Sequence, residues 1–177
     1  MASITALLHT ENDALRLGRA LETLYACDDI LIVDHGSRDA TVRIAREYGA
    51  RVLDAMTESS PEAYLRTAAN SARPRPSAGP AWILCLDPRE SLTEKLAASL
   101  FEWKSESFHT QSSHTQASAP PAFSIFLREE TAQGWLQVPT AQTRLVPETW
   151  NVWNGRLPVH AASALALEGE LLRFVFP

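Results

Sequence analysis

The amino-acid sequence predicts an α/β fold with a mainly parallel sheet flanked by helices. Within residues 1–103, short apolar runs alternate with segments whose apolar residues recur at helical spacing. The apolar runs are aliphatic throughout instead of alternating with polar residues, which is typical of strands covered by helices on both faces. This rhythm predicts parallel strands that are joined by crossover helices.

The first two strands and their helices follow directly from this pattern. Strands are predicted at Ile4–Leu8 and Ile30–Val33. An amphipathic helix over residues 13–25 follows the first strand, and its apolar positions are Ala14, Leu17, Leu21 and Leu24. A second helix is predicted from about Asp39 to Tyr48, and it ends at Gly49 because glycine is favoured just beyond a helix.

Two more strands and two more helices continue the alternation. Arg51–Leu53 is a third strand, and Pro61–Ala72 is a helix with proline in its first turn. A fourth strand is predicted at Trp82–Leu86. Ser91 and Glu94 have the spacing of a capping box, which predicts a helix with an apolar face of Leu92, Leu96, Leu100 and Trp103.

The remainder of the sequence has a different composition. Residues 104–121 are polar and rich in Ser, Thr and Gln, which predicts a flexible loop that lies near the ligand pocket as a lid. Five strand-like runs follow: Phe123–Leu127, Trp135–Val138, Thr143–Val146, Trp150–Trp153 and Leu171–Phe176. They predict a small mixed or antiparallel C-terminal extension, and we expect residues 1–177 to form a single domain.

Composition excludes several classes of function. A formal net charge of −5 argues against a broad nucleic-acid surface. No apolar run approaches the length of a membrane span and no signal peptide is visible, so we expect a cytoplasmic protein. Peripheral membrane association and homo-oligomers stay open. Cys27 and Cys85 lie in apolar surroundings, which predicts buried free thiols and no disulfide.

Polar residues follow the predicted parallel strands at the points where the strands end. Thr10 and Asp13 come after the first strand, Asp34 after the second and Asp87 after the fourth. In an open parallel sheet, ligands bind beyond the carboxyl ends of the strands. We therefore expect a site at this edge that binds a ribose, a base or a metal ion. Asp13 has an equally good alternative role as a helix cap.

Four segments together resemble family-2 glycosyltransferases. They are "TENDALRLGRALETL" (10–24), "DDILIVDHGSRDATVRIAREYGARVL" (28–53), "YLRTAANSA" (64–72) and "AWILCLDPRE" (81–90). The second keeps a Val-Asp-x-Gly-Ser-x-Asp-x-Thr core in full. Within the family, the chain looks most like bacterial lipopolysaccharide-core and other surface-glycan transferases. The resemblance implies a GT-A-like (Rossmann-like) fold, with residues 1–103 as the nucleotide-binding half and residues 122–177 as a reduced acceptor-side half.

The resemblance also implies roles for individual residues. Thr10, Asp13 and Asp34 would line the nucleotide pocket, and Arg66 would lie near the diphosphate of a nucleotide-sugar donor. The donor sugar would be linked to UDP or ADP. Asp87 would contact the ribose or a metal ion. "TRLVPETWNVWNGRLPVHAA" (143–162) is similar to a later family region, in which His160 matches a histidine and Ala161 replaces a glutamate. His160 or an acidic residue would take the proton of the acceptor hydroxyl, on a glycan or a lipid-linked acceptor.

Arg89 stands where the family carries a second metal-binding aspartate. A guanidinium is a permanent cation and repels Mg²⁺ or Mn²⁺, so a divalent metal is doubtful and Asp87 alone stays as a candidate metal ligand. Arg89 could instead bind the diphosphate itself. In the alternative, it points to solvent or pairs with Glu90 or Glu94.

Two classes of function remain open at this stage. The chain is either a glycosyltransferase or a non-catalytic relative that binds a nucleotide, a sugar or a partner protein. The intact first half favours the former, and the altered "DPR" and "HAA" segments favour the latter. Trp150 and Trp153 form either a sugar-stacking platform or a small core. His35 is expected to face solvent near the pocket, and His109 with His114 is a weak candidate for zinc.

Overall fold

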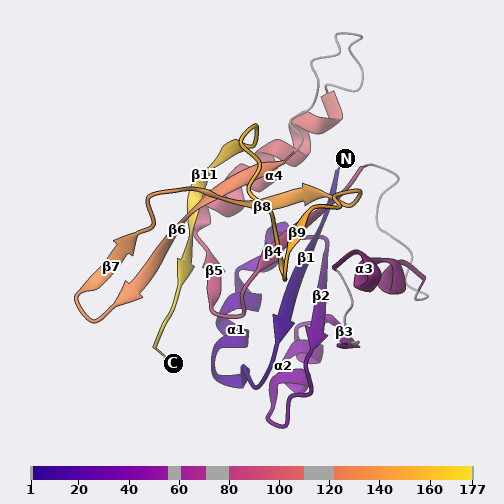
Figure 1. The fold of residues 1–177 in the computed structure, drawn as a ribbon. Coiled ribbons are helices and arrows are strands. Elements are labelled where there is room, and N and C mark those ends of the chain that lie inside the picture. The colour runs from indigo at the N-terminus through magenta and orange to yellow at the C-terminus, as the bar shows by residue number, and fades with distance from the viewer. Residues whose placement is uncertain (1, 56–60, 71–79, 110–121, 177) are drawn as a thin grey trace.

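The computed structural model describes residues 2–55, 61–70, 80–109 and 122–176. Its elements, labelled in Figure 1, are β1 Ser3–Thr10, α1 Ala14–Glu22, the 3₁₀ turn η1 Leu24–Ala26, β2 Asp29–Asp34, α2 Thr41–Glu47, β3 Arg51–Asp54, α3 Pro61–Asn70, β4 Ala81–Leu86, β5 Glu90–Leu92, α4 Glu94–His109, β6 Phe123–Thr131, β7 Gly134–Gln137, β8 Gln142–Pro147, β9 Trp153–Asn154, β10 Leu157–Pro158 and β11 Leu165–Arg173. One large sheet has the order β3-β2-β1-β4-β8-β6-β11-β5, with β7 paired to β6.

The first four strands of the sheet are parallel, so the predicted α/β class is confirmed. β1 lies between β2 and β4, with Thr10 opposite Asp34 and Leu8 opposite Leu86. The carboxyl ends of these strands therefore meet at one edge of the sheet, which is the lower edge in Figure 1. This carboxyl edge is where the sequence predicted the site.

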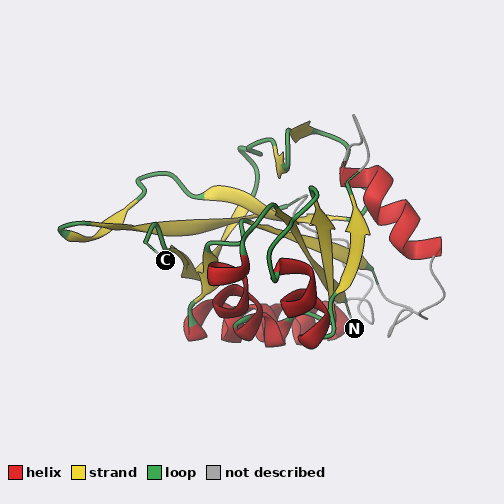
Figure 2. Cartoon of the chain, turned by 90° about the horizontal axis from the view of Figure 1, so that it is seen from below, coloured by secondary structure: helices red, strands yellow, loops and turns green. Residues whose placement is uncertain are grey.

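Helices cover one face of the sheet, and a helix and a hairpin cover the other. Figure 2 shows α1, α2 and α4 on one side and α3 with the β9–β10 hairpin on the opposite side. Successive residues of a strand point to opposite faces, so Leu8 packs toward α1 and α4 whereas Leu7 packs toward α3. Each face thus has its own apolar core, which explains why the parallel strands are continuously apolar.

The C-terminal strands extend the main sheet. β8 pairs antiparallel with β4, β6 pairs antiparallel with β8, and β11 then runs parallel to β6. β5 pairs antiparallel with the end of β11 at the outer edge. The β6–β7 hairpin projects away from the body in Figure 1, and all four residues of β7 are exposed. The mixed extension is therefore integral to the sheet.

The prediction of a flexible loop over residues 104–121 is wrong for its first six residues. α4 continues to His109, so Lys104 lies in a regular helix. The Lys104 ammonium is buried and donates to both carboxylate oxygens of Asp28 at 2.8 and 2.7 Å and to the Ala26 carbonyl at 3.3 Å. These partners are distant in the sequence, and they neutralise the Lys104 charge that had favoured a solvent-exposed loop. Residues 110–121 lie outside the described part of the chain, so the predicted lid stays a prediction.

The start of α4 differs from the predicted capping box. The first helical residue is Glu94, and the Thr93 hydroxyl accepts a hydrogen bond from the Leu96 amide at 3.3 Å. Ser91 instead belongs to β5, and its hydroxyl donates to the Arg19 carbonyl. Thr93 rather than Ser91 is therefore the cap, because β5 occupies the residues just before it.

Two strand boundaries in the C-terminal part were also predicted wrongly. The strand expected at Trp150–Trp153 is mostly irregular, and β9 comprises Trp153–Asn154 alone. The strand expected at Leu171–Phe176 begins earlier, at Leu165, and ends at Arg173. The helix expected to end at Ala72 is described to Asn70, and the two residues beyond it are not described.

No helix in the described ranges has both the length and the apolar composition needed to cross a membrane.

Candidate functional site

The loops that follow β1 and β2 are joined side by side at the carboxyl edge. The Asn12 amide donates to the Ser37 hydroxyl at 2.9 Å, and the Asn12 side chain accepts from the Arg38 amide at 2.8 Å. Asn12 has a φ of 56°, a left-handed conformation that asparagine tolerates better than most residues. The Asp13 amide adds a bond to the Thr41 hydroxyl at 2.8 Å. The two loops therefore form one rigid platform.

Thr10 and Asp34 form the floor of this platform. Both are buried, and the Thr10 hydroxyl donates to Asp34 Oδ1 at 3.0 Å. Asp34 also accepts from the Ser37 hydroxyl at 2.5 Å and from the amides of Gly36 and Ser37. Burial would raise the pKa of Asp34, but the bonds from Ser37, Thr10 and Gly36 outweigh it and hold the pKa below its usual value. The two residues thus shape the turn, while a ligand would meet the atoms above them.

Asp13 lies half-buried above this floor. Its carboxylate accepts from the Glu11 amide at 2.9 Å and makes no capping bond to α1, whose first amide donates to Asp39 instead. Burial raises the pKa of Asp13, the nearby charge of Asp87 raises it further, and the Glu11 amide opposes the shift. Of the two roles that the sequence left open for Asp13, side-chain capping of α1 is therefore absent.

Asp87 and Arg89 form a close pair just beyond β4. Arg89 Nε donates to Asp87 Oδ1 at 2.8 Å, and Arg89 Nη2 donates to Asp87 Oδ2 at 3.0 Å. The Arg89 amide adds a third bond to Oδ1 at 2.9 Å. Burial would raise the pKa of Asp87, but these bonds from Arg89 outweigh it and lower the pKa. The partner of Arg89 is therefore Asp87 and not Glu90 or Glu94, while part of the side chain does face solvent.

The opposite pKa shifts of Asp13 and Asp87 separate the chemistry of two neighbouring carboxyl groups. Asp87 holds its negative charge down to lower pH, whereas Asp13 retains a proton more readily. Two carboxyl groups whose environments push their pKa values apart are typical of acid–base pairs in active sites. Asp13 can therefore exchange a proton with a neighbouring group, whereas Asp87 stays charged and paired with Arg89.

A buried ionic network supports the loop that carries Asp87. Glu90 is fully buried, and its Oε2 accepts from the Asp87 amide at 2.9 Å. Arg144, which is 1% exposed, donates to both Glu90 oxygens at 3.0 and 2.9 Å. Arg173 adds a bond to Glu90 Oε1 at 2.7 Å. Sequence reasoning missed this Glu90 network (Glu90, Arg144 and Arg173), because both arginines are distant in the sequence from Glu90, which opens the short strand β5.

Two histidines adjoin the platform on the α3 side of the sheet. Nδ1 of buried His9 lies 3.0 Å from Nε2 of half-buried His35, so His35 does not simply face solvent as expected. Burial lowers the pKa of His9 to about 4, and Arg156 and His35 lower it further. Burial and Arg156 also lower the pKa of His35. Both rings are therefore neutral at pH 7, and Nε2 of His9 has no partner among the described residues.

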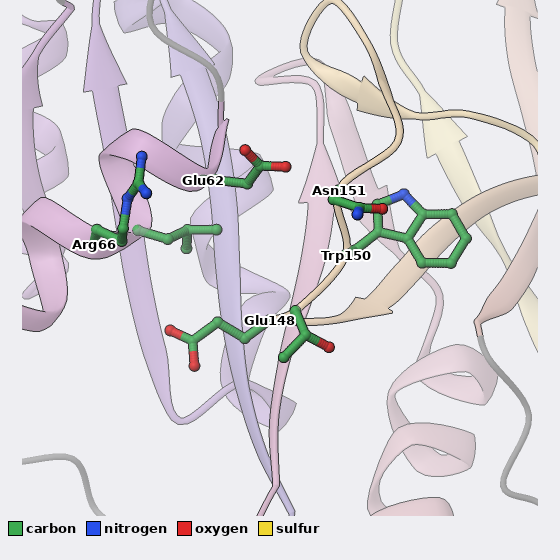
Figure 3. A pocket seen from close by; sticks show the side chains of 7 residues that line it. Glu62, Arg66, Glu148, Trp150 and Asn151 are labelled. Atoms are coloured by element: carbon green, nitrogen blue, oxygen red, sulfur yellow. The ribbon is translucent and has the colours of Figure 1, made fainter.

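Arg66 lies in a separate pocket. This open pocket of about 390 Å³ lies between α3 and the segment after β8, and Figure 3 shows Glu62, Arg66, Glu148 and Trp150 lining it. The Glu148 amide donates to the Ala81 carbonyl, which places this side of the pocket at the amino end of β4. Six residues of a strand span roughly 20 Å, so the pocket wall lies well away from Asp87. The structure thus does not bring Arg66 to the other candidates.

His160 is exposed and follows the β9–β10 hairpin. The amide of its neighbour Ala161 donates to the Thr143 hydroxyl at 2.9 Å. Leu145 pairs with Leu84, so Thr143 lies level with the carboxyl end of β4 and brings His160 toward the same edge as Asp87. No described contact joins the His160 side chain to the other candidates, and its role stays a prediction.

The two tryptophans pack on the α3 face. Trp153 Nε1 donates to Glu62 at 2.9 Å, and Trp150 Nε1 donates to the Val152 carbonyl at 2.7 Å. Both rings adjoin the core on that side of the sheet, which favours the small core over an open platform. Trp150 also lines the pocket of Figure 3, at the opposite edge from Asp87.

The residues present do not fit a divalent metal ion in the family manner. Both oxygens of Asp87 already bind the guanidinium of Arg89. Within the described ranges, no three His, Cys, Asp or Glu side chains are arranged to hold a metal ion. The side chain of His109 and all of His114 fall outside what is described, so the zinc hypothesis is not tested.

The sequence is similar to glycosyltransferases over about a third of its length. No family model matches it. A stretch of 54 residues is 39% identical to an uncharacterized glycosyltransferase of Rickettsia felis, and covers 30% of this chain and 19% of that protein. A stretch of 65 residues is 31% identical to the 4,4′-diaponeurosporenoate glycosyltransferase of Staphylococcus aureus, and covers 35% and 17%. The matches therefore span about a fifth of these relatives' lengths.

Solved structures give a more distant likeness. Glucosyl-3-phosphoglycerate synthase from Mycobacterium tuberculosis, crystallised with Mn²⁺ and UDP, is 16% identical with a TM-score of 0.40, over 72% of this chain and 43% of that one. TarS of S. aureus is 15% identical with a TM-score of 0.48, over 84% and 29%.

Proposed function

We propose that this chain is a family-2, GT-A-like glycosyltransferase that binds a nucleotide-sugar at the carboxyl edge of β1, β2 and β4. The observation that carries the proposal is the proximity of Asp13, on the rigid platform, to the Asp87–Arg89 pair beyond the end of β4. The sequence similarity to two glycosyltransferases supports the same reaction class. A nucleotide offers a ribose, a base and a diphosphate, which are the groups that carboxylates, backbone amides and a guanidinium recognise.

In the proposed site, some residues stabilise the platform and others contact the ligand. Thr10 and Asp34 stabilise the turn that faces the base and the ribose. Their own polar atoms already form hydrogen bonds within the protein. Asp87 and Arg89 face the diphosphate side. Asp13, whose pKa is raised, would accept a proton from the acceptor hydroxyl as that oxygen attacks the sugar. His160 is the second candidate for this base.

We further propose a donor linked to UDP or ADP and a glycan or lipid-linked acceptor of a bacterial surface polysaccharide, met in the cytoplasm or at the membrane surface. The resemblance of residues 10–90 to surface-glycan transferases supports this choice. Arg66 and Trp150 line a pocket at the other edge of the sheet, so neither enters the proposed nucleotide site.

A non-catalytic nucleotide-binding protein is the second candidate. The pairing of Asp87 with Arg89 favours it, because the carboxylate that would organise a metal-assisted reaction is neutralised within the protein. The replacement of an expected glutamate by Ala161 points the same way.

Calorimetric titration with UDP, ADP and GDP tests nucleotide binding, and release of nucleoside diphosphate from the matching nucleotide-sugars tests turnover. We expect one nucleotide to bind, and Asp13→Asn to slow release by roughly a hundredfold, the usual contribution of a general base. Glu168→Gln is the matched control, since Glu168 is an exposed residue of β11 and pairs with Lys95.

Binding without release, in the presence of any acceptor fraction, would favour the non-catalytic candidate. Failure of all three nucleotides to bind would contradict both.

A further inference from the structure

The guanidinium of Arg89 is held by one edge and open on the other. Nε and Nη2 bind the two oxygens of Asp87, and the side chain remains 39% exposed. Among the described residues, Nη1 has no hydrogen-bond partner. A guanidinium carries five donors in a planar fork, so Nη1 and the second Nη2 hydrogen are available to an acceptor outside the pair.

The backbone of this pair is fixed from two directions. Glu90 accepts from the Asp87 amide at 2.9 Å and donates its own amide to the Asp87 carbonyl at 2.9 Å. The Arg89 carbonyl accepts from the Phe174 amide at 2.9 Å, which ties the turn to the residue after β11. A cation fixed in this way loses little conformational freedom when it binds an anion.

Further cations surround the same edge. Arg16, in the first turn of α1, lies close enough to Asp13 to lower its pKa, and its buried Nε has no partner among the described residues. Arg173 lies close enough to Asp87 to lower its pKa as well. A buried donor without an acceptor is uncommon, and a bound ion is one of its explanations. Arg16 Nε and Arg89 Nη1 are therefore two donors at this edge that have no partner in the described part of the chain.

We propose that this site binds the diphosphate of a nucleotide without a divalent cation, with Arg89 as the anion-binding group and Asp87 as the residue that positions it. The inference rests on the proposed function, because it assumes that the ligand is a nucleotide. Both oxygens of Asp87 are engaged with Arg89, so a metal ion would have to displace a permanent cation. Arg89 instead offers two N–H groups to the phosphate oxygens, and Arg16 adds a second positive charge.

The test is calorimetric titration of the full chain with UDP, ADP and GDP, once in EDTA and once with Mn²⁺. We expect the nucleotide that binds to have the same affinity in both buffers. Arg89→Ala should weaken binding roughly ten- to a hundredfold, as expected for charge-assisted bonds to phosphate. Arg89→Asp should make binding depend on Mn²⁺, because a second carboxylate then stands beside a released Asp87.

Two control variants separate a local effect from a general one. Arg43→Ala removes an exposed arginine that pairs with Glu47 on α2, and it should leave the affinity unchanged. Arg89→Lys keeps the charge but loses the fork, so it should bind more weakly than the unaltered protein and more tightly than Arg89→Ala. Thermal unfolding of each variant shows whether the fold is intact.

The failures are distinguishable. Binding that requires Mn²⁺ in the unaltered protein, or an unchanged affinity in Arg89→Ala, would overturn the inference and leave the proposed function standing. Absence of nucleotide binding in both buffers would overturn the proposed function and the inference with it.

Discussion

Removal of Arg144 should strongly destabilise the fold, although the residue lies beneath the site and not in it. Arg144 is 1% exposed and donates to both oxygens of Glu90, to the Cys85 carbonyl at 3.2 Å and to Gln142 at 2.7 Å. Arg144→Met keeps the length of the side chain and removes every one of these bonds. Glu90 would then remain buried with Arg173 as its one cation.

The expected cost follows from this residual pairing. Breaking a buried ion pair by removing one partner costs about 3–5 kcal/mol. Because Arg173 still bonds Glu90 Oε1 at 2.7 Å, we expect the lower end, about 3 kcal/mol of unfolding free energy. For a domain of this size, that corresponds to a fall of roughly 6–12 °C in Tm.

Urea denaturation followed by tryptophan fluorescence measures this difference, with Arg43→Met as the control. Arg43 and Glu47 form an exposed pair, with side chains 68% and 56% accessible, so the control should lose at most about 0.5 kcal/mol. The double variant Arg144→Met/Glu90→Met should lose less than the sum of the two single variants, because the two residues interact directly. If Arg144→Met were no worse than Arg43→Met, the Glu90 network would have no structural importance.

Three further predictions concern other parts of the molecule. Buried His9 has a pKa of about 4, against 6.5 in the unfolded chain, so it stays neutral in the folded protein. The free energy of unfolding should therefore fall by about 2 kcal/mol from pH 7 to pH 5 in urea titrations. His9→Gln should remove most of this fall. Gly169→Ala should lower Tm far more than Gly155→Ala: both have positive φ, but a Cβ at Gly169 would lie 2.3 Å from the backbone of α4, whereas Gly155 has open space. Burial raises the pKa of both thiols to about 12, so a thiol reagent at pH 8 should leave Cys85 unmodified and reach half-buried Cys27 slowly at most, until urea exposes both.

The parallel half could be predicted because its information is local. Continuous aliphatic runs such as Ile30–Val33 form a strand wherever helices cover both faces, and β2 has these residues at its centre. The C-terminal half depends on distant partners. Nothing near Lys104 in the sequence indicates that Asp28, 76 residues away, is its ion-pair partner. A helix with a buried ammonium was therefore predicted as a polar loop. A mixed or antiparallel extension was predicted, but the pairing of β8 with β4 that attaches it to the main sheet has no local signal.

The candidate site shows the same division. Sequence position alone brought Thr10, Asp34 and Asp87 to one edge, because the carboxyl ends of parallel strands meet there. It could not show that the carboxylate oxygens of Asp34 accept hydrogen bonds from the turn that follows β2. The Glu90–Arg144 pair joins residues 54 apart and has no local signal. The Asp87–Arg89 pair joins residues only two apart, but Glu90 and Glu94 are also near Arg89 in the sequence, and nothing local selects Asp87.

The hydrogen bonds between the Asp87 turn and the end of β11 affect the order in which parts of the protein can fold during synthesis. Arg173 lies 83 residues downstream of Glu90, and the Phe174 amide completes the bonding of the Arg89 carbonyl. A ribosome therefore releases β1 to β4 long before the residues that fix the turn exist, and the early sheet can form while its ligand-binding loop is still loose. A newly made chain would therefore gain the anion affinity proposed above only when β11 docks, and not while the sheet grows.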